Sequence, residues 1–248
     1  MAEAQLETEH SIPDDEGEAL TSTLPVRLLP FQGCWLTPRA AKSVTLVHTQ
    51  FQPRDDDILL ATFPKSGTTW LKALAFTILN RLRYPITGSG QHPLLLHHPH
   101  DLVPHRDLHP VMELEAIPSP RLLCTHLPHA LLPSGMSSAL GCRVVYICRE
   151  PKDVIVSSWH FGNKVGKDFF VEFDKLFESF CEGVTLFGPL WDHYLGYWKQ
   201  SLIEPDKVLF LKYDEMMADP SKHVEMLAEF LRVPFTVEEK NAGVERKW

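Results

Sequence analysis

The stretch Asp57-Ile-Leu-Leu-Ala-Thr-Phe-Pro-Lys-Ser-Gly-Thr-Thr-Trp70 decides the fold of this chain. Its apolar run at residues 58–61 predicts a buried strand, and the apolar residues that follow Trp70 recur at helical spacing. Between them lies a loop, residues 63–67, whose backbone N–H groups stand at the N-terminus of the helix. Such N–H groups, together with the helix dipole, suit a phosphate group. The stretch therefore predicts a strand–loop–helix unit that binds a phosphorylated ligand.

The loop carries its own donors for an anion. Lys65 adds a positive charge, Gly67 allows close approach of the backbone, and the hydroxyl groups come from Ser66, Thr68 and Thr69. The order differs from the nucleotide-triphosphate pattern G-x-x-x-x-G-K-[ST], because here the lysine precedes the glycine. We therefore predict a metal-free phosphate site. The alternative is an ordinary turn with a helix cap, since Gly and Thr also cap helices.

Further strands alternate with helices along the chain. The predicted strands are residues 57–63, 121–125, 143–148 and 207–211. The predicted helices run from Pro151 to about Phe161, through Phe170, Phe173, Phe177 and Phe180, through Trp191, Tyr194, Leu195 and Trp198, and through Val224, Leu227, Ala228 and Leu231. This alternation predicts a single α/β domain with a mainly parallel central sheet and helices on both faces. Residues 84–120 lack periodicity and predict an irregular excursion.

Composition restricts the class of protein. The 248 residues are 44% hydrophobic and carry a net charge of -8, which provides no general attraction for nucleic acid or anionic membranes. The sequence shows neither a signal peptide nor a transmembrane run, and five cysteines are an odd number, so we predict a cytoplasmic protein with reduced thiols. Residues 1–24 predict a disordered acidic tail, 28–240 the folded domain, and 241–248 an atypical tail.

Two residues stand at the ends of predicted strands, where ligands of α/β proteins bind. His126 follows the strand at 121–125, and a histidine can accept a proton near neutral pH. Arg149 follows the strand at 143–148, where its guanidinium group suits a phosphate. The alternatives are a packed histidine, with His129 as the nearest competitor for the base, and a salt bridge from Arg149 to Asp153 or Glu150.

Four segments together resemble the cytosolic sulfotransferase family. They are Thr62-Phe-Pro-Lys-Ser-Gly-Thr-Thr-Trp70, Thr125-His-Leu-Pro128, Arg149-Glu-Pro-Lys-Asp-Val-Ile-Val-Ser-Ser-Trp-His-Phe161 and Tyr213-Asp-Glu-Met216. Their order and spacing agree with that family, and the run Gly33-Cys-Trp-Leu36 is similar to its plant branch. The resemblance implies transfer of a sulfonate group from 3′-phosphoadenosine 5′-phosphosulfate to a hydroxyl or amine of a small molecule. It also implies in-line displacement, a P-loop-like fold and no metal.

The resemblance implies a role for each matched residue. The implied donor-binding residues are Lys65, Ser66, Gly67, Thr68, Thr69, Trp70, Arg149, Ser157 and Tyr213. His126 is implied as the catalytic base, and Lys65 as the group that stabilises the leaving phosphate. Trp70 and Tyr213 are implied to lie by the adenine, although both could equally be core aromatic residues.

Two departures from the family accompany the resemblance. Cys124 stands where many members have a lysine that assists the leaving group. The chain ends where the family continues with an Arg-Lys-Gly segment that grips the 3′-phosphate, which predicts a C-terminally truncated member. The alternative function is therefore a catalytically weak or inactive nucleotide-binding remnant. The acceptor stays open among flavonoids, hydroxyjasmonates, steroids and similar compounds, as does the oligomeric state.

Overall fold

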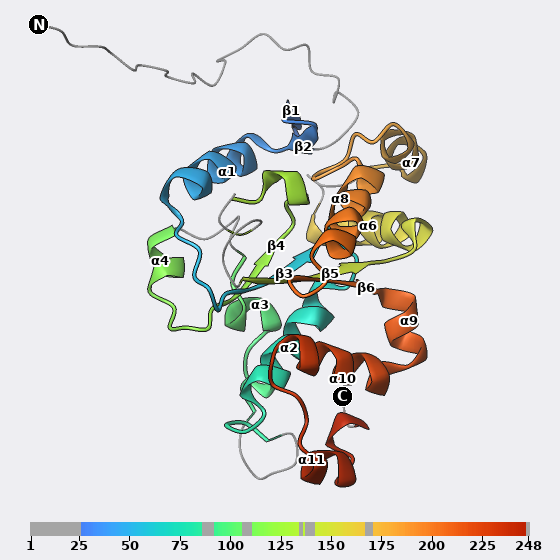
Figure 1. Ribbon diagram of the computed structural model, residues 1–248. Coiled ribbons are helices and arrows are strands. Elements are labelled where there is room, and N and C mark those ends of the chain that lie inside the picture. Colours follow the sequence, from blue (N-terminus) through green and yellow to red (C-terminus); the bar gives the residue numbers. More distant parts are fainter. Residues whose placement is uncertain are drawn as a thin grey trace, which may run out of the picture.

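The computed structural model describes residues 26–85, 92–105, 111–133, 136, 142–166 and 171–246. Within these ranges the chain forms a mixed α/β fold around a four-stranded parallel sheet (Figure 1). The strand order is β4 (Leu122–Thr125), β3 (Ile58–Thr62), β5 (Arg143–Cys148) and β6 (Val208–Lys212). The predicted fold class is confirmed, and each strand lies within two residues of its predicted bounds. The predicted acidic tail, residues 1–24, lies outside the described residues.

The register of the sheet decides which loops meet. β3 pairs with β4 from Ile58 opposite Leu122, and with β5 as far as Thr62 opposite Ile147. Because all four strands are parallel, their carboxyl ends meet at one edge of the sheet. The loops that follow β3, β4 and β5 therefore emerge side by side.

Alternate strand residues face opposite sides of the sheet, as the two-residue period of a strand requires. Leu59 and Ala61 of β3 join one core cluster, and Ile58 and Leu60 join the other. Since all four side chains are buried, β3 reads as a continuous apolar run rather than an alternating one.

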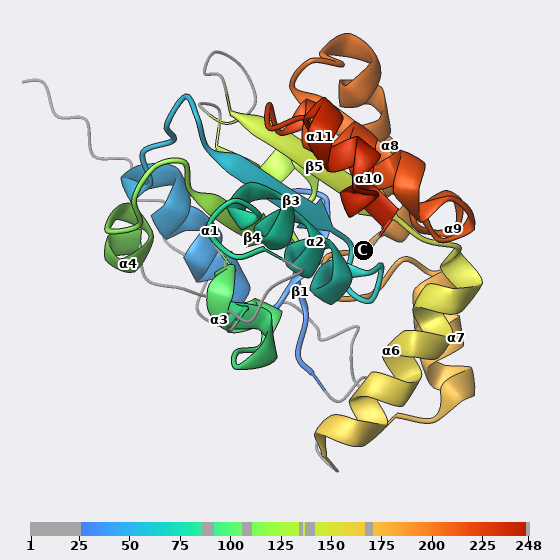
Figure 2. The same cartoon turned by 90° about the horizontal axis from the view of Figure 1, so that it is seen from below.

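Helices cover both faces (Figures 1 and 2). One face packs against α1 (Pro38–Gln50), α8 (Leu190–Ile203) and the antiparallel hairpin of β1 (Leu29–Phe31) and β2 (Cys34–Leu36). The other face packs against α2 (Thr68–Asn80), α9 (Tyr213–Ala218) and α10 (Pro220–Phe230). α6 (Pro151–Val165) and α7 (Phe173–Cys181) contact each other and lie to one side of the sheet (Figure 2).

Several elements differ from the predictions in extent. α6 runs four residues beyond the predicted end at Phe161, to Val165. α7 begins at Phe173, and Phe170 of its predicted pattern lies outside the described residues. The predicted helix around Val224 begins at Pro220, where Asp219 caps it by accepting from the backbone N–H of Lys222 at 3.2 Å.

The excursion at residues 84–120 is only partly irregular. Its described parts hold the short helices η1 (Pro93–Leu95), α3 (Pro99–Leu102) and α4 (Val111–Glu115). Each is too short to show a periodic apolar pattern, so propensity alone could not reveal it. Two other short 3-10 helices are η2 (His129–Leu131) and η4 (Val244–Arg246).

The helix α11 (Val237–Asn241) is joined to the body by an ion pair. Arg81 donates from Nε to Glu239 Oε1 at 2.8 Å and from Nη2 to the carbonyl of Pro234 at 2.7 Å. Val244, after α11, packs against the core cluster that contains α2 and α10. Part of the predicted tail at residues 241–248 therefore contacts the domain.

A buried ion pair joins the amino ends of β3 and β4. Arg121 Nε donates to Asp57 Oδ1 at 2.7 Å, and Nη2 donates to Asp57 Oδ2 at 2.6 Å. Both side chains have no solvent exposure. This pair lies at the edge of the sheet opposite the predicted ligand site.

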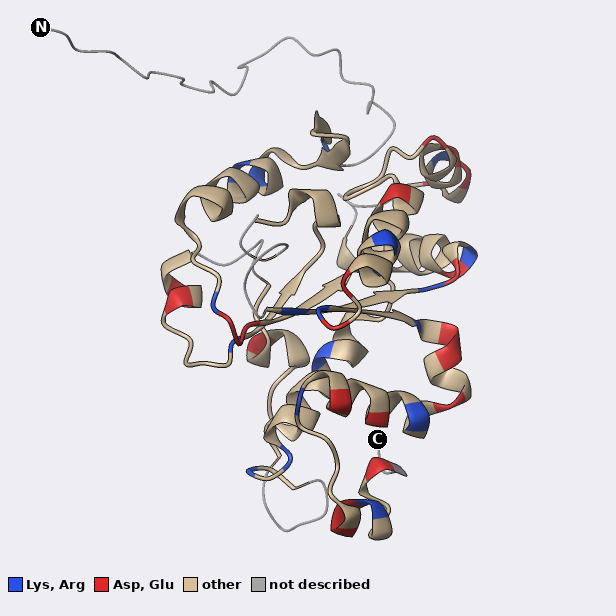
Figure 3. Cartoon of the chain, in the orientation of Figure 1, with Lys and Arg blue, Asp and Glu red and all other residues tan. Residues whose placement is uncertain are grey.

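Charged residues of both signs lie on the outer helices (Figure 3). Within the described ranges, no helix has the length and apolar character needed to span a bilayer.

Candidate functional site

The loop between β3 and α2 is shaped by two residues with positive φ. Lys65 has φ 68° and Gly67 has φ 106°. At Gly67 a side chain is also excluded by space, because a Cβ there would lie 3.0 Å from Tyr213 Cδ2. Gly67 is the N-cap of α2 and offers no side-chain cap to the first helical N–H groups. The predicted strand–loop–helix unit is therefore present, with a helix N-terminus that no side chain of its N-cap residue covers.

The loop hydroxyl groups are held by neighbouring segments. Thr68 Oγ1 lies 2.7 Å from Thr62 Oγ1, and Ser66 is fully buried. Thr69 Oγ1 lies 3.2 Å from His100 Nε2 in α3. These contacts fix the orientation of the hydroxyl groups around the N-terminus of α2.

His126 lies beside this loop, directly after β4, and its tautomer follows from its contacts. Nδ1 lies 2.7 Å from the backbone oxygen of Thr62 and 3.1 Å from Thr62 Oγ1. A carbonyl oxygen can only accept a hydrogen bond, so Nδ1 carries the hydrogen. Nε2 of the neutral ring is therefore the basic nitrogen, and the strand end of β3 fixes its direction.

A second histidine supports the His126 backbone from α8. His193 donates from Nε2 to the carbonyl of His126 at 2.9 Å, and its Nδ1 accepts from the hydroxyl group of Tyr146 at 2.7 Å. Burial lowers the pKa of His193 to about 3 and raises the pKa of Tyr146 well above its usual value. Both groups are thus neutral at pH 7, as this directed pair of hydrogen bonds requires.

Arg149 follows β5 and faces the same loop. Its Nη1 lies 3.5 Å from the backbone oxygen of Lys65, and its guanidinium carbon lies 4.9 Å from the centre of the Tyr213 ring. Nη2 pairs with Asp153 at 3.2 Å, so the predicted alternative of a salt bridge is also realised. Nε is buried, and no described group accepts from it. A buried donor of this kind is costly unless an anion approaches it.

The side chain of Lys65 extends toward α6. Nζ lies 3.8 Å from the centre of the Phe161 ring, a cation–π contact. Burial, followed by the charges of Lys164 and Arg149, lowers the pKa of Lys65. Three cations thus gather around this loop, and a bound anion would relieve their repulsion.

The remaining predicted residues border the same region. Trp70 and Tyr213 are half-buried, pack against the core, and meet edge to face with 5.9 Å between their ring centres. Ser157 is half-buried on α6, the helix that begins at Pro151 just after Arg149. The structure therefore brings Trp70 and Tyr213 together beside the loop and presents Ser157 on the helix that follows Arg149.

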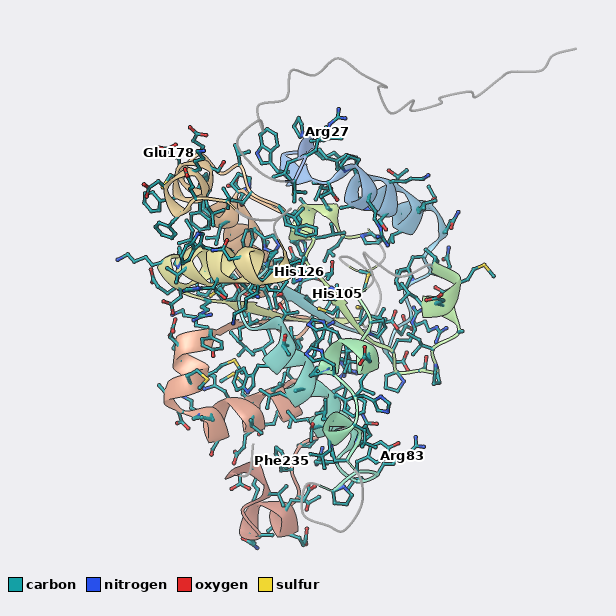
Figure 4. All side chains as sticks on the ribbon, turned by 180° about the vertical axis from the view of Figure 1, so that it is seen from behind. Arg27, Arg83, His105, His126, Glu178 and Phe235 are labelled. Atoms are coloured by element: carbon teal, nitrogen blue, oxygen red, sulfur yellow. The ribbon has the colours of Figure 1, made fainter. Side chains whose placement is uncertain are left out.

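A column of histidine rings approaches His126 from the excursion. The ring centres of His98 and His100 lie 5.0 Å apart, those of His100 and His105 lie 5.4 Å apart, and those of His105 and His126 lie 4.7 Å apart. Figure 4 shows His105 and His126 side by side near the sheet, far from Arg83 and Phe235. His98, His100 and His105 belong to residues 84–120, for which the sequence predicts an irregular excursion and no catalytic residue.

Lys72 of α2 orients this column. Its side chain is fully buried, and Nζ donates to the carbonyl of Val103 at 2.8 Å and to His100 Nδ1 at 2.9 Å. Burial, followed by the charge of Lys72, lowers the pKa of His100 to about 4. The neutral ring therefore carries its hydrogen on Nε2 and donates it to Thr69 Oγ1. The Thr69 hydroxyl hydrogen is left to point elsewhere, as a phosphate ligand would need.

Four residues of this region, Lys72, His193, Tyr146 and Tyr194, are not predicted from the sequence as site residues. Lys72 had a signal, since a lysine beside Leu71 and Leu74 interrupts the apolar face of a predicted buried helix. His193 and Tyr194 had none, because their partners lie 45 to 128 positions away in sequence.

A pocket lies beside the β1–β2 hairpin and the segment of residues 128–130. Its lining includes Gly33, His129 and Phe187, and the Phe187 ring centre lies 5.6 Å from that of His126. The described residues contain no group of three or more His, Cys, Asp or Glu side chains that could hold a metal ion. The site thus places the N-terminus of α2 and Arg149 on one side of His126, and Phe187, which lines the pocket, on another.

Comparisons with known proteins identify the family of this chain. The family model described as a sulfotransferase domain matches residues 55–246. Cytosolic sulfotransferase 12 of Arabidopsis thaliana is 42% identical over 238 residues, which cover 91% of this chain and 73% of that protein. Cytosolic sulfotransferase 5 of Arabidopsis thaliana is 42% identical over 245 residues, which cover 93% of this chain and 75% of that protein.

Solved structures show the same likeness. The crystal structure of a putative steroid sulphotransferase from Arabidopsis thaliana matches with a TM-score of 0.78 and 39% identity, covering 96% of this chain and 88% of that one. A mouse sulfotransferase, SULT7A1, solved in complex with PAP, matches with a TM-score of 0.67 and 26% identity, covering 88% of this chain and 73% of that one.

Proposed function

This chain belongs to the sulfotransferase domain family, and on that premise we propose that His126 is the base for sulfonate transfer from 3′-phosphoadenosine 5′-phosphosulfate to a small-molecule hydroxyl or amine. The family resemblance in the sequence is confirmed, including its plant branch, and the enzyme class is a sulfotransferase that uses this donor. The observation that carries the proposal is the meeting of His126, the β3–α2 loop and Arg149 at one edge of the sheet.

The residues present fit the donor. The buried Nε of Arg149 lacks an acceptor among the described residues, and the N-terminus of α2 lacks a side-chain cap. When bound, the nucleotide supplies the sulfonate group and a phosphate leaving group. We assign its 5′ end to the loop residues Lys65, Ser66, Gly67, Thr68 and Thr69, its 3′-phosphate to Arg149 and Ser157, and its adenine to Trp70 and Tyr213.

The proton is taken up by His126. A hydroxyl group is a poor nucleophile, and the Nε2 atom of His126 can accept its proton because Nδ1 is held as a donor by Thr62. The imidazolium that results keeps its Nδ1 hydrogen bond to the Thr62 carbonyl, which stabilises its charge. Lys65 and the first N–H groups of α2 offset the negative charge that develops on the leaving phosphate oxygen.

Cys124 does not assist the leaving group. It is buried on the same strand as Thr125, pairs in register with Leu60, and lies in the apolar core cluster on the face of α2. We therefore assign the stabilisation of the leaving group to Lys65 rather than to a second lysine.

The donor assignment is tested by titration calorimetry with 3′-phosphoadenosine 5′-phosphate (PAP). Removing charge-assisted hydrogen bonds worth about 1.5–3 kcal/mol predicts binding that is roughly 10–100-fold weaker in Arg149→Ala, with a similar loss in Lys65→Ala. Arg83→Ala is the matched control, because Arg83 is exposed and lies far from His126 (Figure 4). Equal affinity in all four proteins would remove the donor site from this edge.

The base assignment is tested by transfer assays. His126→Ala should bind PAP as the wild type does but lose transfer by at least about a hundredfold, since general base catalysis contributes roughly 10²–10⁴-fold. His129→Ala is the control, because His129 competes for the role in sequence but packs edge to face on Tyr197. Transfer retained in His126→Ala and lost in His129→Ala would reverse the assignment.

The acceptor class and the cellular location are parts of the same proposal. We propose a small-molecule acceptor with a hydroxyl or amine group, to be identified with a panel of flavonoids, hydroxyjasmonates and steroids, and a cytoplasmic location in line with the names of the relatives. The alternative, a nucleotide-binding protein with little or no turnover, predicts PAP binding by the wild type with no product from any member of the panel.

A further inference from the structure

Tyr194 of α8 contacts both loops that surround the proposed donor site. Its hydroxyl group donates to the carbonyl of Arg149 at 2.7 Å and accepts from the N–H of Arg149 at 3.2 Å. The same oxygen lies 3.4 Å from Ser66 Oγ in the β3–α2 loop. The side chain of Tyr194 thus contacts the backbone of the loop after β5 and a hydroxyl group of the β3–α2 loop.

The hydrogen-bonding capacity of this hydroxyl group is fully used. Tyrosine has one O–H donor and two acceptor lone pairs. Because the proton goes to the Arg149 carbonyl, Ser66 must be the donor in its contact with Tyr194. Burial raises the pKa of Tyr194, so the phenol stays protonated and keeps this arrangement.

The ring of Tyr194 packs against one aromatic residue that follows β3 and one that lies in β5. Its centre lies 6.5 Å from the ring centre of Phe63, after β3, and 6.2 Å from that of Tyr146 in β5, edge to face in both cases. The preceding residue, His193, is fully buried and bonded to Tyr146 and to the His126 backbone. α8 therefore holds the Tyr194 hydroxyl group in one place.

The contacts of Tyr194 join the two loops beyond the point where the hydrogen bonds between β3 and β5 end. The last described pair of the β3–β5 ladder is Thr62 opposite Ile147. Beyond it, the other described hydrogen bond between the loops runs from Arg149 Nη1 to the Lys65 carbonyl and is 3.5 Å long, at the limit of a hydrogen bond. The Tyr194–Arg149 bond of 2.7 Å is much shorter and acts on the backbone.

We propose that Tyr194 is a positioning residue that sets the distance between the 5′-phosphate loop and Arg149. The inference rests on the proposed donor site. A nucleotide with phosphate groups at both ends engages both loops at once and benefits from loops already held at the right separation. A nucleotide with a single phosphate group engages one loop and gains little from their spacing.

The test compares PAP with adenosine 5′-monophosphate and adenosine 3′-monophosphate by calorimetry on the full chain. Tyr194→Phe keeps the ring and removes the hydroxyl group. We expect its affinity for PAP to fall about tenfold, a free energy close to the net contribution of a typical hydrogen bond. Its affinity for either monophosphate should change less than about twofold. In transfer assays the KM for the donor should rise more than kcat falls.

Tyr197→Phe is the matched control. Tyr197 lies one turn further along α8, is fully buried, and donates to the carbonyl of Leu127 at 2.8 Å, so the same atom is removed from the same helix. Both variants should lose similar thermal stability, but only Tyr194→Phe should lose preference for PAP over the monophosphates. The stoichiometry from calorimetry gives the fraction of each protein that is folded and able to bind.

Three results would overturn the inference. If the wild type binds PAP and Tyr194→Phe binds it equally well, the positioning role is wrong while the proposed function stands. If Tyr194→Phe weakens PAP and the monophosphates by the same factor, the effect is a general loss of structure. If the wild type does not bind PAP at all, the proposed donor site fails and the inference fails with it.

Discussion

The buried pair of Asp57 and Arg121 offers the clearest test of how this sheet is stabilised. We consider Asp57→Asn, which keeps the size of the side chain and removes its charge. The carboxylate accepts two hydrogen bonds from Arg121, at 2.7 and 2.6 Å, and one from the N–H of Arg54 at 2.8 Å. In the variant the amide can still accept, but the fully buried guanidinium group loses its main counter-charge.

The expected cost follows from these contacts. Breaking a buried ion pair by removing one partner typically costs about 3–5 kcal/mol, because an uncompensated charge stays in the interior. Arg121 keeps a contact of 3.0 Å to Glu115 and a hydrogen bond of 2.7 Å to the carbonyl of Gln52. We therefore place the loss at the lower end, about 3 kcal/mol of the free energy of unfolding. For a chain of this length that corresponds to a fall in Tm of roughly 6–12 °C.

The assay is urea unfolding together with thermal unfolding, for the wild type and for Asp57→Asn. Lys175→Ala is the control, because it breaks an ion pair with Glu172 whose partners are 53% and 66% exposed, and surface pairs contribute little. The control should match the wild type. The double variant Asp57→Leu/Arg121→Met should be more stable than Asp57→Asn, since no buried charge is left without a partner. A loss below about 1 kcal/mol in Asp57→Asn would refute the reasoning.

Three further predictions concern the site. Gly67→Ala should weaken PAP binding by at least tenfold in calorimetry, because a Cβ at φ 106° would lie 3.0 Å from Tyr213; unchanged affinity would show that the loop can shift without cost. The pKa of His193 is about 3, below the ordinary 6.5, so the unfolded chain takes up a proton that the folded protein does not, and stability is lost as the pH falls from 6.5 toward 3. Between pH 8 and pH 5 the free energy of unfolding, measured in urea, should therefore fall by about 2 kcal/mol less in His193→Gln than in the wild type. Equal losses in the two proteins would contradict the lowered pKa of His193. Lys72→Met removes a charge that lowers the pKa of His100, so that pKa should rise above about 4 in an NMR titration, whereas an unchanged value would mean that the charge of Lys72 does not contribute to it.

The sequence was sufficient wherever the signal is local. The apolar run of residues 58–61, the Pro151 at the start of a helix and the glycine before Thr68 each specify a backbone state from neighbouring residues alone, and each was located correctly. The hairpin of β1 and β2 and the helix α1 were not foreseen, because strands of three residues carry little periodicity. α1 begins at Pro38 with Thr37 as its cap, and this Thr-Pro pair is a local signal for a helix start.

In the candidate site too, local sequence patterns predict some features and contacts between distant residues decide the others. Lys65 and Arg149 could be found as residues that follow buried strands, and His126 as a histidine at a strand end, because in a parallel sheet such positions share one edge. The sequence does not predict the tautomers of the histidine rings or the direction of the hydrogen bonds between side chains. The tautomer of His126 depends on the Thr62 carbonyl, 64 positions earlier in the chain.

The sequence by itself determined the strand–loop–helix unit, the parallel sheet and the family, since these follow from short-range patterns of apolar, glycine and charged residues. Only the tertiary structure decided that Tyr194 bridges two loops and that His193 supports the His126 backbone. Hydrogen bonds between distant segments depend on the register of β3 with β5 and on the position of α8 across the sheet. Shifting that register by one residue would turn each side chain to the other face, and no local pattern in the sequence specifies such contacts.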